Sequence, residues 1–295
     1  MKHLRYFDAL ARQRHFGRAA AMCAISQPAL SLQIKELEEI LAAPLVERGP
    51  REIRLTSLGE AFAARVREIL RAVEELSDLA RASDDRLAGL LRIGVIPTIA
   101  PYYLPGVIAQ LARHYPELEI QPREAVTQKL IAGLLDGDLD IAIAALPVSE
   151  PSLEETELFE EEFVLVRPQS EAGAPAPDPE NLAEMRLLLL EEGHCFRDQA
   201  LSFCDLPASR ARNLMEGSSL STLVQLVGAG IGVTLIPQMA VAVEARSAPV
   251  ALTRLPGPGP RRRVGMLWRR SSPLAAQFTR ICDVLRAQGD RLGPE

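Results

Sequence analysis

The segment Ser26-Gln27-Pro28-Ala29-Leu30-Ser31-Leu32-Gln33-Ile34 has the composition of a helix start, and it organises the first part of the chain. Ser26 or Gln27 can cap the helix. Pro28 suits its first turn, because proline lacks the N–H that would be unpaired there. Apolar residues continue at helical spacing through Leu37 and toward Leu41. A helix is therefore expected from about residue 27 onward.

Two shorter helices are expected before this segment. Leu4 to Arg14 carries a helical stripe of apolar side chains, Gly17 interrupts it, and Arg18 to Cys23 fits a second short helix. Short helices joined by a tight turn predict a helix-turn-helix, the unit that places one helix in the major groove of DNA.

A hairpin and a long helix are expected next. Glu47 to Leu55 contains Gly49-Pro50 and predicts a small hairpin, or wing. Ser57 to Leu87 is apolar along one side and charged along the other, and we expect Gly89 to end this helix. A helix of about 45 Å must bury such a stripe against a partner, which predicts dimerisation.

The remainder of the chain alternates strands and helices. The order strand, helix, strand, helix, strand implies a parallel sheet with right-handed crossovers. These elements are expected at Leu91–Ile96, Tyr102–Tyr115, Leu118–Arg123, Thr127–Leu135 and Asp140–Ala144. Further strands are expected at Phe163–Arg167, Leu187–Leu190, Gly232–Ile236 and Val264–Trp268, and further helices at Ser219–Val227 and Pro273–Ala287.

Charge is unevenly distributed over the 295 residues, whose net charge is −6. Residues 1–60 hold nine Lys and Arg against seven Asp and Glu, so the head is mildly basic and the remaining body acidic. A basic head fits a small nucleic-acid-binding module. No apolar run reaches the roughly 20 residues of a membrane span, and the N-terminus lacks an apolar signal core. We therefore expect a cytoplasmic protein with no membrane partner.

Two of the four cysteines lie in one segment, Gly193-His194-Cys195-Phe196-Arg197-Asp198-Gln199-Ala200-Leu201-Ser202-Phe203-Cys204. In a helix, nine residues rise about 13.5 Å and turn half a circle. A disulfide needs Cα atoms within roughly 7 Å, so a bond between Cys195 and Cys204 would require the helix to unwind. This is the chemical outline of a redox switch.

Polar and basic side chains gather on the expected recognition helix and wing. Such groups contact base edges and phosphates when the start of a helix enters the major groove. The candidate DNA-binding residues are Ser26, Gln27, Pro28, Ser31, Gln33, Lys35, Arg48, Arg51 and Arg54.

The N-terminal pattern resembles the LysR-type transcriptional regulators. It comprises Ala19-Ala20, Ser26–Ser31, Gln33-Ile34, Leu37-Glu38, Leu45–Arg48 and Leu55–Gly59. The resemblance implies a winged helix-turn-helix at 1–57, a linker and dimerisation helix at 58–88, and a redox-sensing effector domain at 89–295. That α/β domain would have two lobes, as in periplasmic binding proteins, with 90–162 plus 267–295 in lobe one and 163–266 in lobe two. It also implies double-stranded DNA as partner, a homotetramer, and contact with RNA polymerase.

The cysteine segment itself resembles the peroxide-sensing segment of one branch of this family, as do Ile96–Tyr102 and Glu124–Gln128. The resemblance implies that hydrogen peroxide oxidises Cys195 and that Cys204 then resolves the sulfenic acid as a disulfide. A thiol at a helix start, with the cationic Arg197 nearby, would favour the reactive thiolate, and His194 is a second candidate for this role. Thr98 and Thr127 would hold the peroxide, and Asp198 would position Arg197 or relay a proton.

Several alternatives remain open from the residues alone. Cys195 could be a small buried hydrophobe, His194 could cap a turn, and Arg197 and Asp198 could form a surface ion pair. The cysteines lack the close spacing of zinc sites, and no cofactor or metal is expected. Two other functions compete: a LysR-type regulator that binds a small organic effector between its lobes, and a thiol peroxidase. An enzyme has little use for the first 60 residues, so a non-enzymatic regulator is preferred.

Overall fold

The computed structural model covers residues 1–295, and it describes residues 1–48, 53–83, 87–203, 216–257 and 259–289. Two compact units divide the chain, Met1–Ala80 and Arg81–Glu295. They are described in turn.

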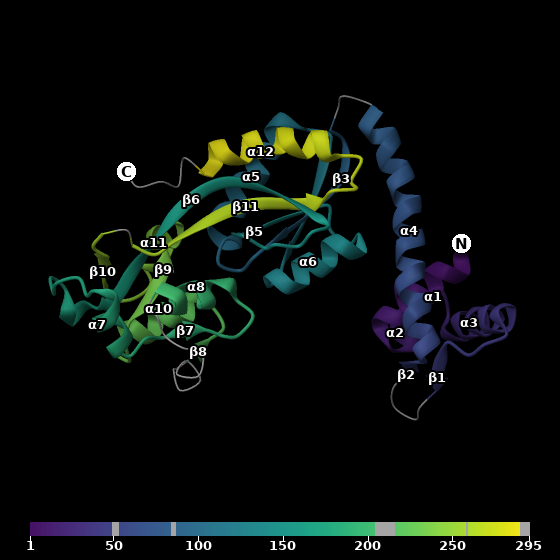
Figure 1. The fold of residues 1–295 in the computed structure, drawn as a ribbon, viewed down its shortest axis with the longest axis horizontal. Helices are drawn as coiled ribbons and strands as arrows, with labels where there is room; N and C mark the ends of the chain where they lie inside the picture. Colours follow the sequence, from purple (N-terminus) through teal and green to yellow (C-terminus); the bar gives the residue numbers. More distant parts are fainter. Residues whose placement is uncertain (49–52, 84–86, 204–215, 258, 290–295) are drawn as a thin grey trace. The chain divides into compact units, whose positions relative to one another are not determined.

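The N-terminal unit begins with the expected helix-turn-helix (Figure 1). Its helices are α1 (Lys2–Gln13), α2 (Phe16–Met22) and α3 (Gln27–Leu41). Ser26 caps α3, because its Oγ accepts a hydrogen bond from the Ala29 backbone N–H at 3.3 Å. The antiparallel strands β1 (Val46–Arg48) and β2 (Ile53–Leu55) form the wing. The buried core of this unit centres on Phe7, Leu10, Leu30, Ile34 and Leu45.

The long helix α4 occupies Ser57–Ser83. Its apolar side chains Leu58, Ile69, Val73, Leu76 and Leu79 are exposed, and dimerisation through this face stays a prediction. The helix was expected to continue to Leu87, and this C-terminal boundary was wrong. Leu87 is not helical, and Gly89, with φ +84°, begins the first strand of the second unit, where its N–H donates to the Glu117 carbonyl at 3.0 Å.

The C-terminal unit is built on one mixed sheet, in the order β10-β6-β11-β5-β3-β4, with β9 also paired to β6. The strands are β3 (Gly89–Val95), β4 (Leu118–Glu124), β5 (Ile141–Leu146), β6 (Leu153–Pro168), β9 (Thr234–Pro237), β10 (Val250–Arg254) and β11 (Arg261–Arg269). Strand β3 is parallel to β4 and β5, as the strand–helix alternation predicts. Strand β11 is antiparallel to both β5 and β6.

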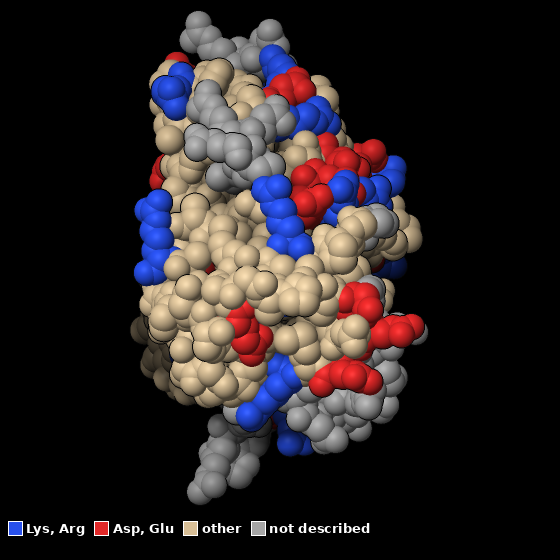
Figure 2. Space-filling view, turned by 90° about the vertical axis from the view of Figure 1, so that its left-hand side faces the viewer, with Lys and Arg blue, Asp and Glu red and all other residues tan. Residues whose placement is uncertain are grey.

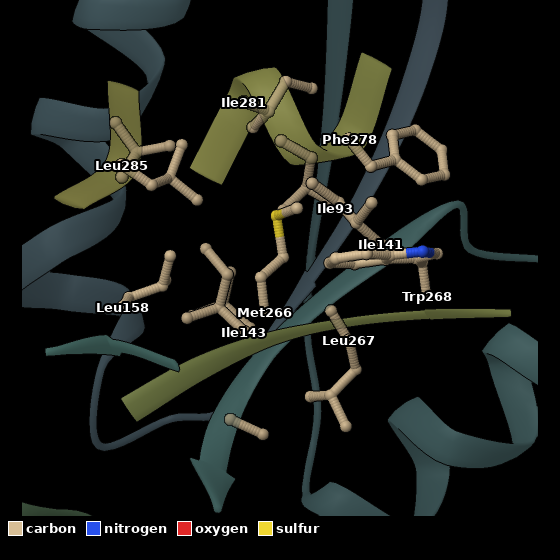
Figure 3. Packing of buried hydrophobic residues seen from close by; sticks show 14 of the residues in the cluster. Ile93, Ile141, Ile143, Leu158, Met266, Leu267, Trp268, Phe278, Ile281 and Leu285 are labelled. Atoms are coloured by element: carbon tan, nitrogen blue, oxygen red, sulfur yellow. The ribbon is translucent and has the colours of Figure 1, made fainter. Parts of the chain in front are cut away.

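The first lobe packs three helices against β3, β4 and β5. Helices α5 (Ala100–His114) and α12 (Ala275–Gly289) lie on one face of the sheet and α6 (Thr127–Asp136) on the other (Figure 1). In the core between the sheet and α12, Met266 points toward the helix while Leu267, the next residue, points to the opposite face (Figure 3). This is the alternation that a strand imposes on neighbouring side chains.

The second lobe has a separate buried core centred on Leu165, Leu188, Leu223, Val224 and Ile236. It contains the 3₁₀ turn η1 (Gln169–Glu171), the short strands β7 (Leu189–Leu190) and β8 (Glu216–Gly217), and four helices among the described residues. These are α7 (Pro179–Glu184), α8 (Cys195–Phe203), α10 (Leu220–Gly228) and α11 (Gln238–Glu244). The short elements η1, α7, α11, β8 and β10 were not expected from the sequence.

Strand β6 runs through both lobes and joins them, whereas β11 pairs with β5 and with Leu153–Glu162 of β6 in the first lobe. Strand β6 starts at Leu153 rather than at the expected Phe163. Its first half was not predicted, because that part of the sequence is acidic and lacks an apolar run. The chain enters and leaves the second lobe side by side, where the Phe163 N–H donates to the Pro260 carbonyl at 2.9 Å. The chain therefore makes two adjacent crossings between lobes.

The surface near α7 and β10 is mostly uncharged (Figure 2). Among the residues coloured there, acidic and basic side chains lie beside one another, unlike the uniformly basic surfaces that bind nucleic acid. None of the helices in the described ranges is both long and apolar enough to span a membrane.

Candidate functional site

Cys195 is the first residue of α8. The chain leaves β7, turns at Glu191–Gly193 and enters the helix, where the Arg197 N–H donates to the His194 carbonyl at 3.0 Å. Gly193 has φ +94°, a left-handed conformation that glycine adopts without strain. The helix start predicted for this cysteine is therefore present. The first N–H groups of a helix have no partner within the helix, so they form a partly positive end next to Cys195.

Cys195 also lies between the two lobes. Its half-buried side chain packs against the core of the first lobe, whereas Phe196, the next residue, is buried in the core of the second. An open cavity of about 470 Å³ borders the thiol. It is lined by Ala145, Leu146, Pro147, Glu160, Cys195, Asp198, Gln199, Arg261, Arg262 and Arg263.

Arg262 is the central polar residue of this region, and the sequence analysis missed it. Its side chain is 0% exposed and pairs with Glu161, with Nε 2.7 Å from Oε1. It also donates to the Thr98 hydroxyl at 2.7 Å and to the Thr98 carbonyl at 3.1 Å. Its guanidinium carbon lies 5.7 Å from the centre of the Phe196 ring. One buried cation thus connects the first lobe to the residue beside Cys195.

A sequence signal for Arg262 existed in the run Arg261-Arg262-Arg263. In a strand, the middle residue of three points away from its neighbours. Arg261 and Arg263 are half exposed and pair with glutamates on β6, so the middle arginine faces the interior. A buried arginine needs a carboxylate, and Glu161 on the adjacent strand provides it.

The two threonines expected to hold peroxide differ in their partners. Thr98 is 2% exposed and its hydroxyl accepts the Arg262 hydrogen bond, so its own O–H remains able to donate. Thr127 is the first residue of α6, and its buried Oγ1 has no hydrogen-bond partner among the described residues. Both threonines follow strands of the first lobe.

His194, Arg197 and Asp198 lie around Cys195 in different environments. Burial lowers the pKa of His194, while the carboxylates of Glu191 and Glu124 oppose this shift. Its imidazole is therefore neutral near pH 7. Arg197 is buried and donates to the Leu190 carbonyl at 2.9 Å, and Asp198 is exposed at the cavity.

Cys204, the expected resolving cysteine, lies outside the described residues. Of the other two cysteines, Cys23 is half-buried, and burial together with the Asp8 carboxylate raises its pKa. Cys282 is 0% exposed, in the core position expected for it. The described residues contain no cluster of His, Cys, Asp and Glu able to hold a metal ion.

The DNA-binding candidates lie on and around α3. Gln27, Pro28 and Lys35 are exposed, whereas Ser31 and Gln33 are half-buried. The Gln33 amide donates to Glu36 at 2.7 Å, which ties it to the side of the helix that meets α1. On the wing, Arg54 is exposed. Arg51 and the side chain of Arg48 lie outside the part of the chain that the structure describes.

Comparison with known proteins identifies the class to which this fold and site belong. Residues 1–60 match the bacterial regulatory helix-turn-helix proteins of the lysR family, and residues 84–290 match the LysR substrate binding domain. The chain belongs to the LysR family of transcriptional regulators, whose helix-turn-helix binds DNA.

The most similar relatives include peroxide-responsive regulators. A probable hydrogen peroxide-inducible genes activator of Streptomyces viridosporus is 41% identical over 290 residues, covering 97% of this chain and 93% of the relative. The DNA-binding transcriptional dual regulator OxyR of Escherichia coli is 38% identical over 292 residues, covering 98% and 96%.

Two solved structures are also similar over nearly the whole chain. Full-length OxyR of Pseudomonas aeruginosa, in a mutant form, has a TM-score of 0.75 and 36% identity, covering 96% of each chain. An OxyR mutant of Corynebacterium glutamicum with hydrogen peroxide bound has a TM-score of 0.69 and 34% identity, covering 99% of this chain and 92% of that one.

Proposed function

We propose that this protein is a peroxide-sensing transcription factor in which Cys195 is the sensing thiol. The observation that carries the proposal is the position of Cys195, the first residue of a helix, half-buried and beside an open cavity between the lobes. The relatives named as hydrogen peroxide-inducible activators and OxyR support it. Buried structural cysteines are inert, whereas thiols at helix starts are activated.

The first chemical step is attack of the Cys195 thiolate on one oxygen of hydrogen peroxide. A sulfur–oxygen bond forms, the oxygen–oxygen bond breaks, and hydroxide leaves and takes up a proton, giving a sulfenic acid. The Thr98 and Thr127 hydroxyls can donate to the peroxide, since neither O–H is committed by a hydrogen bond that we observe. Asp198, exposed at the cavity, can pass a proton.

The second step joins Cys195 to Cys204. The Cys204 thiol attacks the sulfenic sulfur, the sulfur–sulfur bond forms, the sulfur–oxygen bond breaks, and water leaves. Helix α8, which separates these positions in sequence, must be remodelled for the sulfurs to meet. Reduction by a dithiol resets the switch.

The remodelled lobe would change how the helix-turn-helix domains of the oligomer bind their operator DNA. We propose a homotetramer that forms partly through the exposed apolar face of α4 and binds adjacent half-sites in double-stranded DNA. It would act in the cytoplasm as an activator, in contact with RNA polymerase. Ser26, Gln27, Pro28, Ser31, Gln33, Lys35, Arg48, Arg51 and Arg54 form the proposed DNA-contacting set.

Intact-mass measurement after brief exposure to micromolar peroxide tests the sensing role. Wild type should lose two hydrogen atoms, Cys204→Ser should instead gain one oxygen, and Cys195→Ser should not change. Cys23→Ser, which alters a cysteine of the other unit, should behave as wild type. An unmodified Cys195 in wild type would end the proposal.

The alternative of a small organic effector has one observation in its favour. The cavity volume lies within the roughly 300–1,000 Å³ range of ligand pockets. Under this alternative, Cys195→Ser would still change its operator footprint when a small carboxylic acid or similar metabolite is added. Under the peroxide proposal, no footprint change survives this substitution.

Two substitutions test the DNA-contacting set. Lys35→Ala should weaken binding to all sequences and make the affinity less dependent on salt, because phosphate contacts release counterions. Gln33→Ala should weaken operator binding more than non-specific binding. Equal loss on every sequence would remove Gln33 from base reading and assign it to the structural hydrogen bond with Glu36.

A further inference from the structure

A second polar connection joins the lobes away from the cavity. The Tyr102 hydroxyl, on α5 of the first lobe, donates to Glu244 Oε1 at 2.7 Å, on α11 of the second lobe. The Ser221 hydroxyl, on α10 of the second lobe, donates to the same oxygen at 2.9 Å. One carboxylate oxygen thus accepts one hydrogen bond across the lobes and one within a lobe.

The burial of these groups makes the connection stronger than a surface contact. Glu244 is 4% exposed, and the ring of Tyr102 packs against the cores of both lobes. Burial and the hydrogen bond to Glu244 raise the pKa of Tyr102 well above its ordinary range, while Arg262 opposes the shift. The Tyr102 hydroxyl therefore stays protonated throughout the physiological pH range and can donate its hydrogen bond to Glu244.

Both partners are linked in sequence to the residues around Cys195. Tyr102 lies four residues after Thr98, on the helix that follows the same loop. Glu244 ends α11, which begins near Met239, whose N–H donates to Glu161 Oε2 at 3.1 Å. Helices α5 and α11 are thus each fixed at one end to the Arg262–Glu161 pair and joined to each other through Tyr102 and Glu244.

From this geometry we infer that Tyr102 and Glu244 are positioning residues for the oxidation of Cys195, acting as a latch that holds the reduced lobes together. Cys195 belongs to the second lobe, whereas Thr98, Thr127 and the cavity wall Ala145–Pro147 belong to the first. The lobe separation consequently sets the distance between the thiol and the two threonines proposed to hold peroxide. The inference rests on the proposed sensing role of Cys195.

The latch makes two predictions of opposite sign. Opening the lobes should slow oxidation by hydrogen peroxide, because the small oxidant loses the hydroxyls of the first lobe. It should also speed alkylation by iodoacetamide, because a bulkier reagent gains access to a half-buried thiol. A variant that merely loosens the fold would change both rates in the same direction.

Rates are measured in full-length protein carrying Cys204→Ser, which isolates the first oxidation step. Tyr102→Phe keeps the ring and removes the interlobe hydrogen bond, and Ser221→Ala is the matched control, since it removes a hydroxyl from the same oxygen within one lobe. For a hydrogen bond to a charged group we expect Tyr102→Phe to slow oxidation about tenfold and to speed Cys195 alkylation several-fold. Ser221→Ala should stay within about twofold of the parent in both rates.

Two further variants keep the test decisive. Glu244→Gln retains an acceptor oxygen for Tyr102 but removes the charge, so its rates should lie between those of the parent and of Tyr102→Phe, whereas Glu244→Ala should reproduce Tyr102→Phe. The double variant Tyr102→Phe with Glu244→Ala should be no slower than either alone, because both remove the same interaction.

The outcomes separate the latch from the proposed function. Equal effects of Tyr102→Phe and Ser221→Ala, or rates that move together, would overturn the latch. If the parent protein is not oxidised by peroxide, the sensing role fails, while the alkylation rates still decide whether Tyr102 and Glu244 hold the lobes together.

Discussion

Cys195 and Cys282 are two free cysteines of one unit, and they differ in burial and in their place within a helix. Cys195 begins a helix beside an open cavity, with the Arg262–Glu161 pair close by through Phe196. Cys282 lies inside α12, fully enclosed by the first-lobe core, and burial raises its pKa to about 11. The difference shows that position in the fold, rather than the residue itself, decides whether a thiol borders a cavity or is enclosed in a core.

The largest expected effect concerns the polar surroundings that Cys195 has and Cys282 lacks. Arg262→Ala leaves Glu161 buried without its cation, and removing one partner of a buried pair costs about 3–5 kcal/mol. The exposed neighbour provides the control, since Arg263→Ala should cost less than about 1 kcal/mol. Urea unfolding of the two variants measures both. Similar losses would mean that the buried pair contributes no more than a surface one.

Thiol labelling compares the cysteines directly. With its pKa raised from 9.0 to about 11, Cys282 holds about 100-fold less thiolate at neutral pH than an ordinary thiol. Brief alkylation of the native protein, followed by peptide mass spectrometry, should modify Cys195 and leave Cys282 unmodified. After unfolding in denaturant both should react alike. Comparable labelling in the native state would show that the core around Cys282 opens readily.

Serine substitutions should have opposite consequences at the two sites. Cys282→Ser places a hydroxyl in an apolar core and should destabilise the protein by about 1–3 kcal/mol, without affecting the peroxide response. Cys195→Ser should cost less than about 1 kcal/mol, because its site is half exposed, yet abolish the response. Thermal unfolding together with operator footprints distinguishes the two. Loss of the response in a folded Cys282→Ser protein would refute this division.

The smallest effect is a pH dependence from His194, which precedes Cys195 in the chain. Because burial lowers its folded-state pKa below the ordinary 6.5, the unfolded chain binds more protons below that pH. The contribution to stability is present above pH 6.5 and is lost as the pH falls through and below it. His194→Asn should therefore reduce the loss of unfolding free energy on acidification. An unchanged pH profile would contradict a buried, neutral imidazole.

Sequence patterns predicted the elements whose physics is local. Ser26 and Pro28 marked the start of α3 because capping and proline geometry need no distant partner, and apolar runs located β3, β5 and the middle of β11. The acidic half of β6 was missed because its stability comes from pairing with β11, which lies a hundred residues later. The helices α7 and α11 were missed because each is too short for a helical period to be recognised in its sequence.

The candidate site was predictable to the same extent. The place of Cys195 at a helix start follows from the turn Glu191–Gly193 and the apolar residues on either side. Arg262, Glu161 and Tyr102 were not found, because each gains its role from a partner on another element. A buried charge is recognised only when the strand that neutralises it is known to be adjacent.

The hydrogen bond between the Phe163 N–H and the Pro260 carbonyl has an evolutionary consequence. It closes the base of the second lobe, so the chain between these two residues is an insertion whose ends already touch. Insertions with adjacent ends are tolerated by the domain that receives them. The second lobe can accordingly be replaced or changed in sequence as one unit, while the first lobe and its sheet retain their architecture.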